Sequence, residues 1–131
     1  MVTREDIQSW LDRLDGGSVT AREVEPNLWI ANTPDGAEVV VHYAPPVLLM
    51  RVRVMELPAG GERQGELFRQ LLELNVRDLV HGSYGLEGDH IVLTDTLELD
   101  NLDYNEFEAS FDSVTMALAS HMSALAPYRQ R

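Results

Sequence analysis

Two strand-like runs joined by two prolines decide the fold: Glu38-Val39-Val40-Val41-His42-Tyr43 and, after Ala44-Pro45-Pro46, Val47-Leu48-Leu49-Met50-Arg51-Val52-Arg53-Val54-Met55-Glu56-Leu57. Both runs are rich in β-branched and other large apolar residues, which favour extended backbone. Proline has no N–H to donate to a sheet, so Pro45 and Pro46 separate the runs. We therefore expect two neighbouring strands of an antiparallel sheet.

The second run has two different faces, because successive side chains of a strand point to opposite sides. One face is apolar throughout and is expected to meet the core: Leu48, Met50, Val52 and Val54. The other mixes apolar and cationic side chains: Val47, Leu49, Arg51, Arg53 and Met55. This mixture is typical of a peptide-binding face, but a half-solvated sheet under a helix is the favoured interpretation, since single apolar groups are common on protein surfaces.

Upstream residues predict a helix and the rest of a meander. Thr3 and Asp6 have the spacing of a capping box for a helix over residues 3–15. Gly16-Gly17 supplies its end, since glycine adopts the left-handed backbone that stops helices. The meander spans residues 19–57, with reversals at Pro26-Asn27 and at Thr33-Pro34-Asp35-Gly36.

Downstream residues predict a helix over 62–75, a hairpin over 82–99 and a helix over 103–125. Asp103 and Glu106 have capping-box spacing at the start of the last helix. The element order is α-β-β-β(-β)-α-β-β-α in one domain, residues 1–131. We expect an α+β fold in which helices pack on an antiparallel sheet.

Charge and composition limit the classes of partner and the cellular compartment that we expect. The chain of 131 residues has 22 acidic and 10 basic residues, a net charge of −12, and every basic residue is Arg. This balance argues against nucleic acid as a partner. The acids dominate from Asp78 to Tyr128, which suits either a basic partner or simple solubility. The absence of cysteine excludes disulfides, and no signal or membrane-spanning run is present, so we expect a cytoplasmic protein.

No residue set predicts catalysis. The four histidines, His42, His81, His90 and His121, lie in no nucleophile or metal motif. Asp89-His90 and Asp78 with His81 could each supply two metal ligands, but no further acid or histidine supports them. The sequence therefore predicts no enzyme, no metal and no cofactor.

The second half of the chain resembles the type III secretion chaperone and YbjN-like family over residues 62–125. The resemblance rests on Leu71-x-x-x-Asn75, which ends a helix, on Gly82-x-x-x-Leu86 in a hairpin, and on Leu97-x-Leu99-x-x-Leu102-Asp103, which leads into the last helix. These are structural signatures, so they indicate the fold more specifically than the function.

The resemblance implies a compact, acidic protein without cofactor, usually a homodimer. Members that serve secretion hold an extended client segment on apolar patches of the first helix and the sheet, whereas YbjN-like relatives are linked to regulation and stress. The second helix and the strand from Ile91 to Leu97 are the expected dimer contact. Gly16-Gly17 would let the first helix pack on its own subunit or on its mate.

We expect a non-enzymatic, dimeric protein-binding module, chaperone-like or a regulatory adaptor. The candidate partner-binding residues are Ile7, Trp10, Leu11, Trp29, Leu49, Arg51, Arg53 and Met55. Ordinary core packing is the alternative for Trp10 and Leu11. The alternative functions are a small-ligand or metal-dependent enzyme, with a pocket lined by His42, His81 or His90, and a structural subunit of a larger assembly.

Overall fold

The computed structural model describes residues 1–129, which form three α-helices, two 3-10 turns and a six-stranded sheet. In chain order these are α1 (Arg4–Arg13), η1 (Leu14–Gly17), β1 (Thr20–Glu25), β2 (Leu28–Asn32), β3 (Glu38–Ala44), β4 (Val47–Glu56), α2 (Gly61–Arg77), β5 (Ser83–Glu87), β6 (His90–Glu98), α3 (Tyr104–Leu125) and η2 (Ala126–Arg129). The predicted α+β class and the predicted order are confirmed, and all four strands of the meander are present.

The sheet is antiparallel throughout, with strand order β1-β2-β3-β4-β6-β5. The first four strands form the meander, and Val41 lies opposite Met50 where β3 pairs with β4. The chain then leaves the sheet through α2 and returns so that β6, not β5, lies beside β4. Strands β1 and β5 are therefore the two edges.

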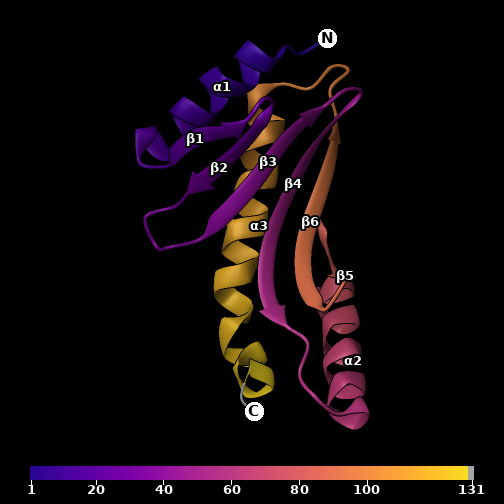
Figure 1. Ribbon diagram of the computed structural model, residues 1–131. Coiled ribbons are helices and arrows are strands. Elements are labelled where there is room, and N and C mark those ends of the chain that lie inside the picture. Colours follow the sequence, from indigo (N-terminus) through magenta and orange to yellow (C-terminus); the bar gives the residue numbers. More distant parts are fainter. Residues whose placement is uncertain (130–131) are drawn as a thin grey trace.

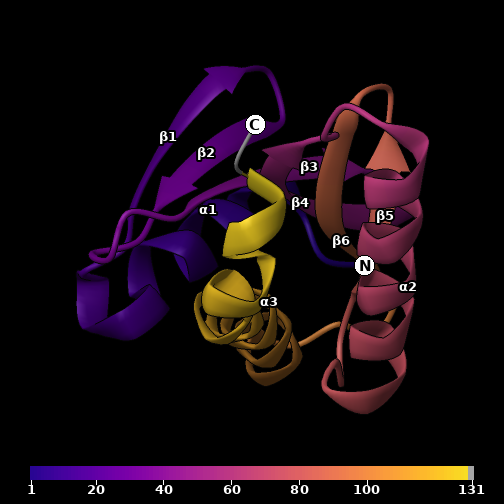
Figure 2. The same ribbon diagram turned by 90° about the horizontal axis from the view of Figure 1, so that it is seen from below.

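All three helices lie on one side of the sheet (Figures 1 and 2). The single core between helices and sheet includes Ile7 and Leu11 of α1, Leu67 and Leu71 of α2, and Phe107 and Val114 of α3. Within residues 1–129 no helix covers the opposite side of the sheet, which we name the open face (Figure 2). The fold thus has two layers, and half of the sheet surface is left to solvent or to a partner.

Capping side chains place the first and last helices where the sequence predicts them. The Thr3 hydroxyl accepts a hydrogen bond from the Asp6 amide at 3.1 Å, and Asp6 accepts one from the Thr3 amide at 2.9 Å. Asp103 and Glu106 form the same reciprocal pair at the start of α3. The first helix ends at Arg13, because Asp15 and Gly16 adopt left-handed backbone with φ of 50° and 64°.

Ion pairing ties α1 to its own sheet. The Arg4 guanidinium donates to Glu23 of β1, and Glu23 also accepts from the Asn27 amide at 2.8 Å. These interactions, led by the Arg4 hydrogen bond, hold the pKa of Glu23 below its usual value. The first helix therefore packs on its own subunit in this structure.

A β-bulge near the end of β4 breaks the alternation that the sequence predicts. Arg53 lies opposite Val92 of β6, and the next pairing joins Met55 to Ile91. Strand β4 therefore has one extra residue, Val54, between two consecutive pairs of the ladder. The extra residue returns Met55 to the helix-covered face, where its side chain is 7% exposed. The prediction that Met55 shares a face with Leu49 and Arg53 is therefore wrong.

Gly82 sets the entry into β5. Its φ is +83°, and a Cβ atom placed there would lie 2.7 Å from the carbonyl oxygen of Thr94 on the neighbouring strand. Only glycine fits this close approach without a backbone shift.

No helix formed by residues 1–129 is both long enough and apolar enough to cross a membrane.

Candidate functional site

Four of the eight predicted partner-binding residues lie in the core, Met55 after the bulge of β4 and three others on α1 and β2. Ile7, Leu11 and Trp29 are 0% exposed. The indole N–H of Trp29 donates to Gln8 of α1 at 2.8 Å, so this tryptophan fastens helix to sheet. The apolar patch predicted on the first helix and on Trp29 is therefore not on the surface of the folded chain, because the helix turns its stripe inward onto its own sheet.

Trp10 is half-buried at the rim of the same core. Its ring lies 5.6 Å from the ring of Phe107 and 6.3 Å from that of Tyr104, measured between centroids. The neighbouring Arg13 guanidinium lies 3.8 Å from the centre of the Tyr104 ring. Trp10 thus packs α1 against α3 and does not line the open face.

The other three candidates, Leu49, Arg51 and Arg53, lie together on the open face of β4. Leu49 and Arg51 border a hollow of about 300 Å³, whose further lining on this face comes from Leu28, Val40, His42, Glu87, Thr94 and Thr96. Leu28, Val40 and Leu49 are half-buried although no helix covers them. Arg51 is paired with Glu87 of β5, with 2.9 Å between Nη1 and Oε2. This surface combines apolar contact area with hydrogen-bonding side chains.

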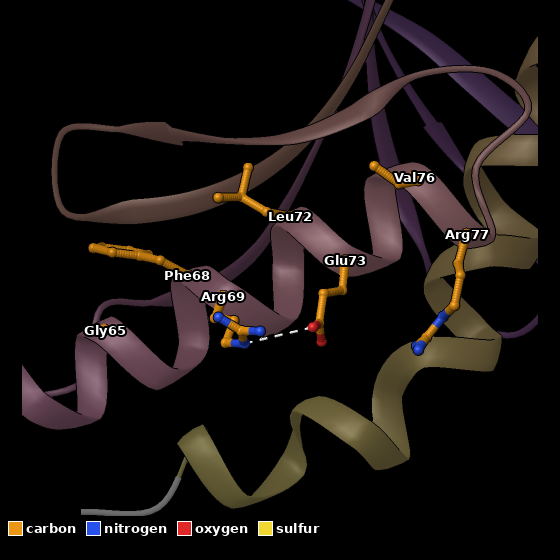
Figure 3. A pocket seen from close by; sticks show the side chains of 7 residues that line it. All are labelled: Gly65, Phe68, Arg69, Leu72, Glu73, Val76 and Arg77. Atoms are coloured by element: carbon orange, nitrogen blue, oxygen red, sulfur yellow. Dashed lines mark ion pairs between the residues drawn. The ribbon is translucent and has the colours of Figure 1, made fainter.

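A second exposed apolar surface runs along α2 and β5. Leu72 is 64% exposed, Val76 87%, Val80 86% and Leu86 55%. Figure 3 shows Leu72 and Val76 on one side of α2 and the Arg69–Glu73 ion pair on another. We name Phe68, Leu72, Val76, Val80 and Leu86 the α2 ridge. A set of large apolar side chains this exposed is characteristic of an interaction surface.

Of the two elements predicted to form the dimer contact, only α2 is accessible in the structure. Helix α2 is accessible along its ridge, but β6 pairs with β4 on one side and β5 on the other. Ile91 and Leu93 of β6 are 1% and 0% exposed and belong to the core. These two side chains are therefore not available to a second copy of the folded chain.

Sequence reasoning missed a hydrogen-bonded chain of three side chains from distant segments, of which Tyr84 and His121 are buried and Asp78 is exposed. The Tyr84 hydroxyl of β5 lies 2.7 Å from Nδ1 of His121 on α3, and His121 Nε2 lies 3.0 Å from Oδ2 of Asp78, just after α2. Burial, together with the negative charge of Asp78, raises the pKa of Tyr84 to about 12. His121 is 37 positions from Tyr84 and 43 from Asp78, so no local pattern could have revealed these hydrogen bonds.

The two-ligand metal candidates are not supported by further ligands. Asp78 is bonded to His121 and not to His81, and Asp89 and His90 flank the β5–β6 turn. Within residues 1–129 no three His, Asp or Glu side chains come close enough to hold a metal ion. The histidines named for a ligand pocket are dispersed, since His42 lies on β3 and His90 at the start of β6.

Several solved structures share this fold. The chain of YbjN from E. coli matches with a TM-score of 0.65 and 14% identity, covering 94% of this chain and 93% of that one. A chain of the Yersinia pestis type III secretion chaperone SycH, in complex with a stable YscM2 fragment, matches with a TM-score of 0.64 and 12% identity, covering 90% and 98%. A chain of the heterodimeric ExoU–SpcU complex from the Pseudomonas aeruginosa type III secretion system matches with 0.59 and 19%, covering 95% and 98%.

The sequence itself identifies the family. No curated protein sequence matches this chain. The family CesT_Tir_1, however, matches residues 2–131, nearly the whole sequence. This is a family of non-enzymatic secretion chaperones, so the expectation of a non-enzymatic protein is confirmed. The chain belongs to the CesT/Tir family of type III secretion chaperones.

Proposed function

We propose that this protein is a cytoplasmic chaperone that holds an extended segment of a client protein on the open face of its sheet, and that it works as a homodimer joined through the α2 ridge. The observation that carries the client site is the sheet itself, which helices cover on one side only. Leu49, Arg51 and Arg53, predicted as partner contacts, all lie on the uncovered side.

The open face has the chemistry that an extended segment needs. Half-buried Leu28, Val40 and Leu49 provide apolar contact around the hollow. Thr94, Thr96 and His42 provide hydrogen-bonding groups beside them for the client's main chain. When an extended peptide is bound, hydrogen bonds to its main chain supply affinity and pockets for its alternate side chains supply specificity. The relatives crystallised as complexes, SycH with a YscM2 fragment and SpcU with ExoU, support a protein client.

The α2 ridge is the proposed contact between copies. An isologous interface places the same patch of both subunits face to face, and the ridge offers large exposed apolar side chains for such a contact. The Arg69–Glu73 pair beside it carries both charges on one helix, so two antiparallel α2 helices would each meet an opposite charge. The dimer would remove Leu72 and Val76 from water, and this burial of apolar surface would stabilise the association.

Site-specific crosslinking tests the client site. A photoreactive amino acid replaces Leu49 on the open face or, as the control, Met116, which is 67% exposed on α3. Irradiation in the native cells should couple position 49, and not position 116, to a protein other than this chain. Equal yields at the two positions, or coupling at neither, would reject the open face as the client site.

Sedimentation velocity tests the dimer. The double variant Leu72→Glu/Val76→Glu should sediment as a monomer while the native protein sediments as a dimer, because two buried carboxylates would oppose association. Met116→Glu adds the same kind of charge away from the ridge and should stay dimeric. A dimer that survives the double substitution would place the contact elsewhere.

A further inference from the structure

A cationic pocket lies at the end of β4, where Arg53 of the open face meets the C-terminal turn η2 that follows α3. It has a volume of about 590 Å³ and is lined by Arg53 of β4, His90 of β6, Tyr128 and Arg129 of η2, and the segment Val54–Ala59. Glu56 is the only carboxylate in this lining, although acids outnumber bases 22 to 10 in the chain. The local charge is thus opposite in sign to that of the whole protein.

The two arginines of this pocket are available to a ligand. The Arg53 side chain is exposed and makes no ion pair or side-chain hydrogen bond within residues 1–129. Arg129 is exposed, and within residues 1–129 its guanidinium makes one hydrogen bond, to the Met122 sulfur at 3.9 Å. Arg51, two residues from Arg53, is by contrast already paired with Glu87. An unpaired guanidinium is a strong and selective donor to carboxylates, because its N–H groups match the two oxygens.

The pocket wall is held in place by the fold. Arg63 of α2 donates to the carbonyl oxygen of Pro127, and its guanidinium lies 5.8 Å from the centre of the Tyr128 ring. These contacts hold the C-terminal turn η2 against the first turn of α2. Pro58, which is buried, and Leu57 complete the apolar part of the wall.

The pocket continues the proposed client surface. Leu49, Arg51 and Arg53 follow one another on the same side of β4, so the distance from Leu49 to Arg53 is about 13 Å, four residues of extended chain. A segment seated over Leu49 would reach the pocket within about that number of residues. This continuity favours an acidic stretch of the client over a free small anion.

We propose that the pocket formed by Arg53, His90, Tyr128 and Arg129 binds acidic side chains of the client, about four residues from an apolar residue seated over Leu49. The inference rests on the proposed client-binding function and adds a direction to it. The bound client segment is apolar where it lies over Leu49 and acidic where it reaches Arg53. The overall charge of −12 disfavours an acidic segment on most of the surface, so the pocket also sets the orientation of the segment.

Fluorescence anisotropy with two labelled synthetic peptides tests this inference. The probe is Leu-Thr-Val-Thr-Glu-Thr-Glu-Glu, and its partner has glutamine in place of every glutamate. The glutamate peptide should bind more tightly to the native protein, and Arg53→Gln or Arg129→Gln should each weaken it about tenfold, the usual effect of losing one charge-assisted hydrogen bond. Neither substitution should alter binding of the glutamine peptide.

Arg22→Gln is the matched control, because Arg22 is an exposed arginine of the same open face on the edge strand β1, far from the pocket, and its loss changes the net charge equally. Equal weakening by Arg22→Gln and Arg53→Gln would reduce the effect to general charge and overturn the inference. So would equal affinity for the two peptides. Inorganic phosphate that binds with the same arginine dependence, while the glutamate peptide does not bind, would assign the pocket to small anions and also overturn it.

The result is separable from the client-site test. Crosslinking at position 49 with no arginine effect on peptide binding would leave the open face as the client site and reject the acidic pocket alone. An Arg53→Gln variant that loses its dimer in sedimentation, with peptide binding unchanged, would assign the pocket to contact between copies of this chain and overturn the inference.

Discussion

Met55 lies opposite Ile91 on the helix-covered face, two residues after Arg53 lies opposite Val92 on the open face. The single bulge between them separates a core side chain from a candidate partner contact. Met55→Ala should therefore lower the free energy of unfolding by about 2–5 kcal/mol, the range for truncating a buried large side chain. Leu49→Ala, on the half-buried open face, should cost less than about 1 kcal/mol. Urea denaturation followed by circular dichroism measures both, and similar losses would contradict the bulge.

Trp29 of β2 is likewise a core side chain and not a partner contact. It is 0% exposed and bonded to Gln8, so Trp29→Ala should cost about 3–5 kcal/mol or prevent folding. The milder Trp29→Phe keeps most of the buried ring area but loses the hydrogen bond to Gln8. Its smaller loss of stability, measured in the same denaturation experiment, keeps the assignment testable if the alanine variant does not fold.

The Tyr84–His121 hydrogen bond should appear as coupling between two mutations. Tyr84→Phe removes the phenolic hydroxyl and should cost about 1–2 kcal/mol. Combined with His121→Ala, its cost should shrink by about 0.5 kcal/mol or more, because the partner is already absent. Tyr43→Phe is the control, since the Tyr43 hydroxyl donates to the Val2 carbonyl and not to His121. Its effect should simply add to that of His121→Ala.

The raised pKa of Tyr84 predicts a loss of stability at alkaline pH. Folding moves this pKa from 10.0 to about 12, so the folded state holds the proton more tightly than the unfolded state. The contribution is complete below pH 10 and is lost as the pH rises toward 12. Denaturation midpoints of the native protein should fall over this window more steeply than those of Tyr84→Phe. Parallel curves would contradict the burial of the hydroxyl.

Two glycines of the same strand region should respond oppositely to alanine. Gly82→Ala meets both a φ of +83° and the Thr94 carbonyl at 2.7 Å, and should cost about 1–3 kcal/mol. Gly85 lies in β5 without a positive φ, and a Cβ atom placed on it would meet nothing within 4 Å. Gly85→Ala should therefore change stability by about 0.5–1 kcal/mol in the stabilising direction. Thermal unfolding of both variants gives the comparison.

Much of the fold follows from short-range chemistry. Thr3 with Asp6 and Asp103 with Glu106 start two helices through hydrogen bonds between residues three apart, and the sequence predicts both pairs. The turn at Thr33–Gly36 is similarly local, with the Thr33 amide bonded to the Ala37 carbonyl at 2.9 Å. Such signals need no knowledge of what lies across the sheet.

The candidate site can be predicted from the sequence only in part. The stripe of Leu49, Arg51 and Arg53 is predictable because side chains alternate along a regular strand. The surface patch predicted from Ile7, Leu11 and Trp29 is wrong, since an amphipathic stripe looks the same whether it meets its own sheet or a partner. The burial of these three residues depends on where α1 docks, which involves residues 21 positions apart, as the Trp29–Gln8 bond shows.

The sequence by itself determined the element order, the helix starts, the turns and the acidic, cysteine-free character of this protein, because each depends on neighbouring residues or on composition alone. The tertiary structure alone decided which side of β4 receives Met55, which apolar stripes are core, and which arginines lie beside Tyr128 at the end of β4. These depend on pairing and packing between distant segments. Strand register and side-chain burial are set by those long-range contacts, and no local pattern encodes them.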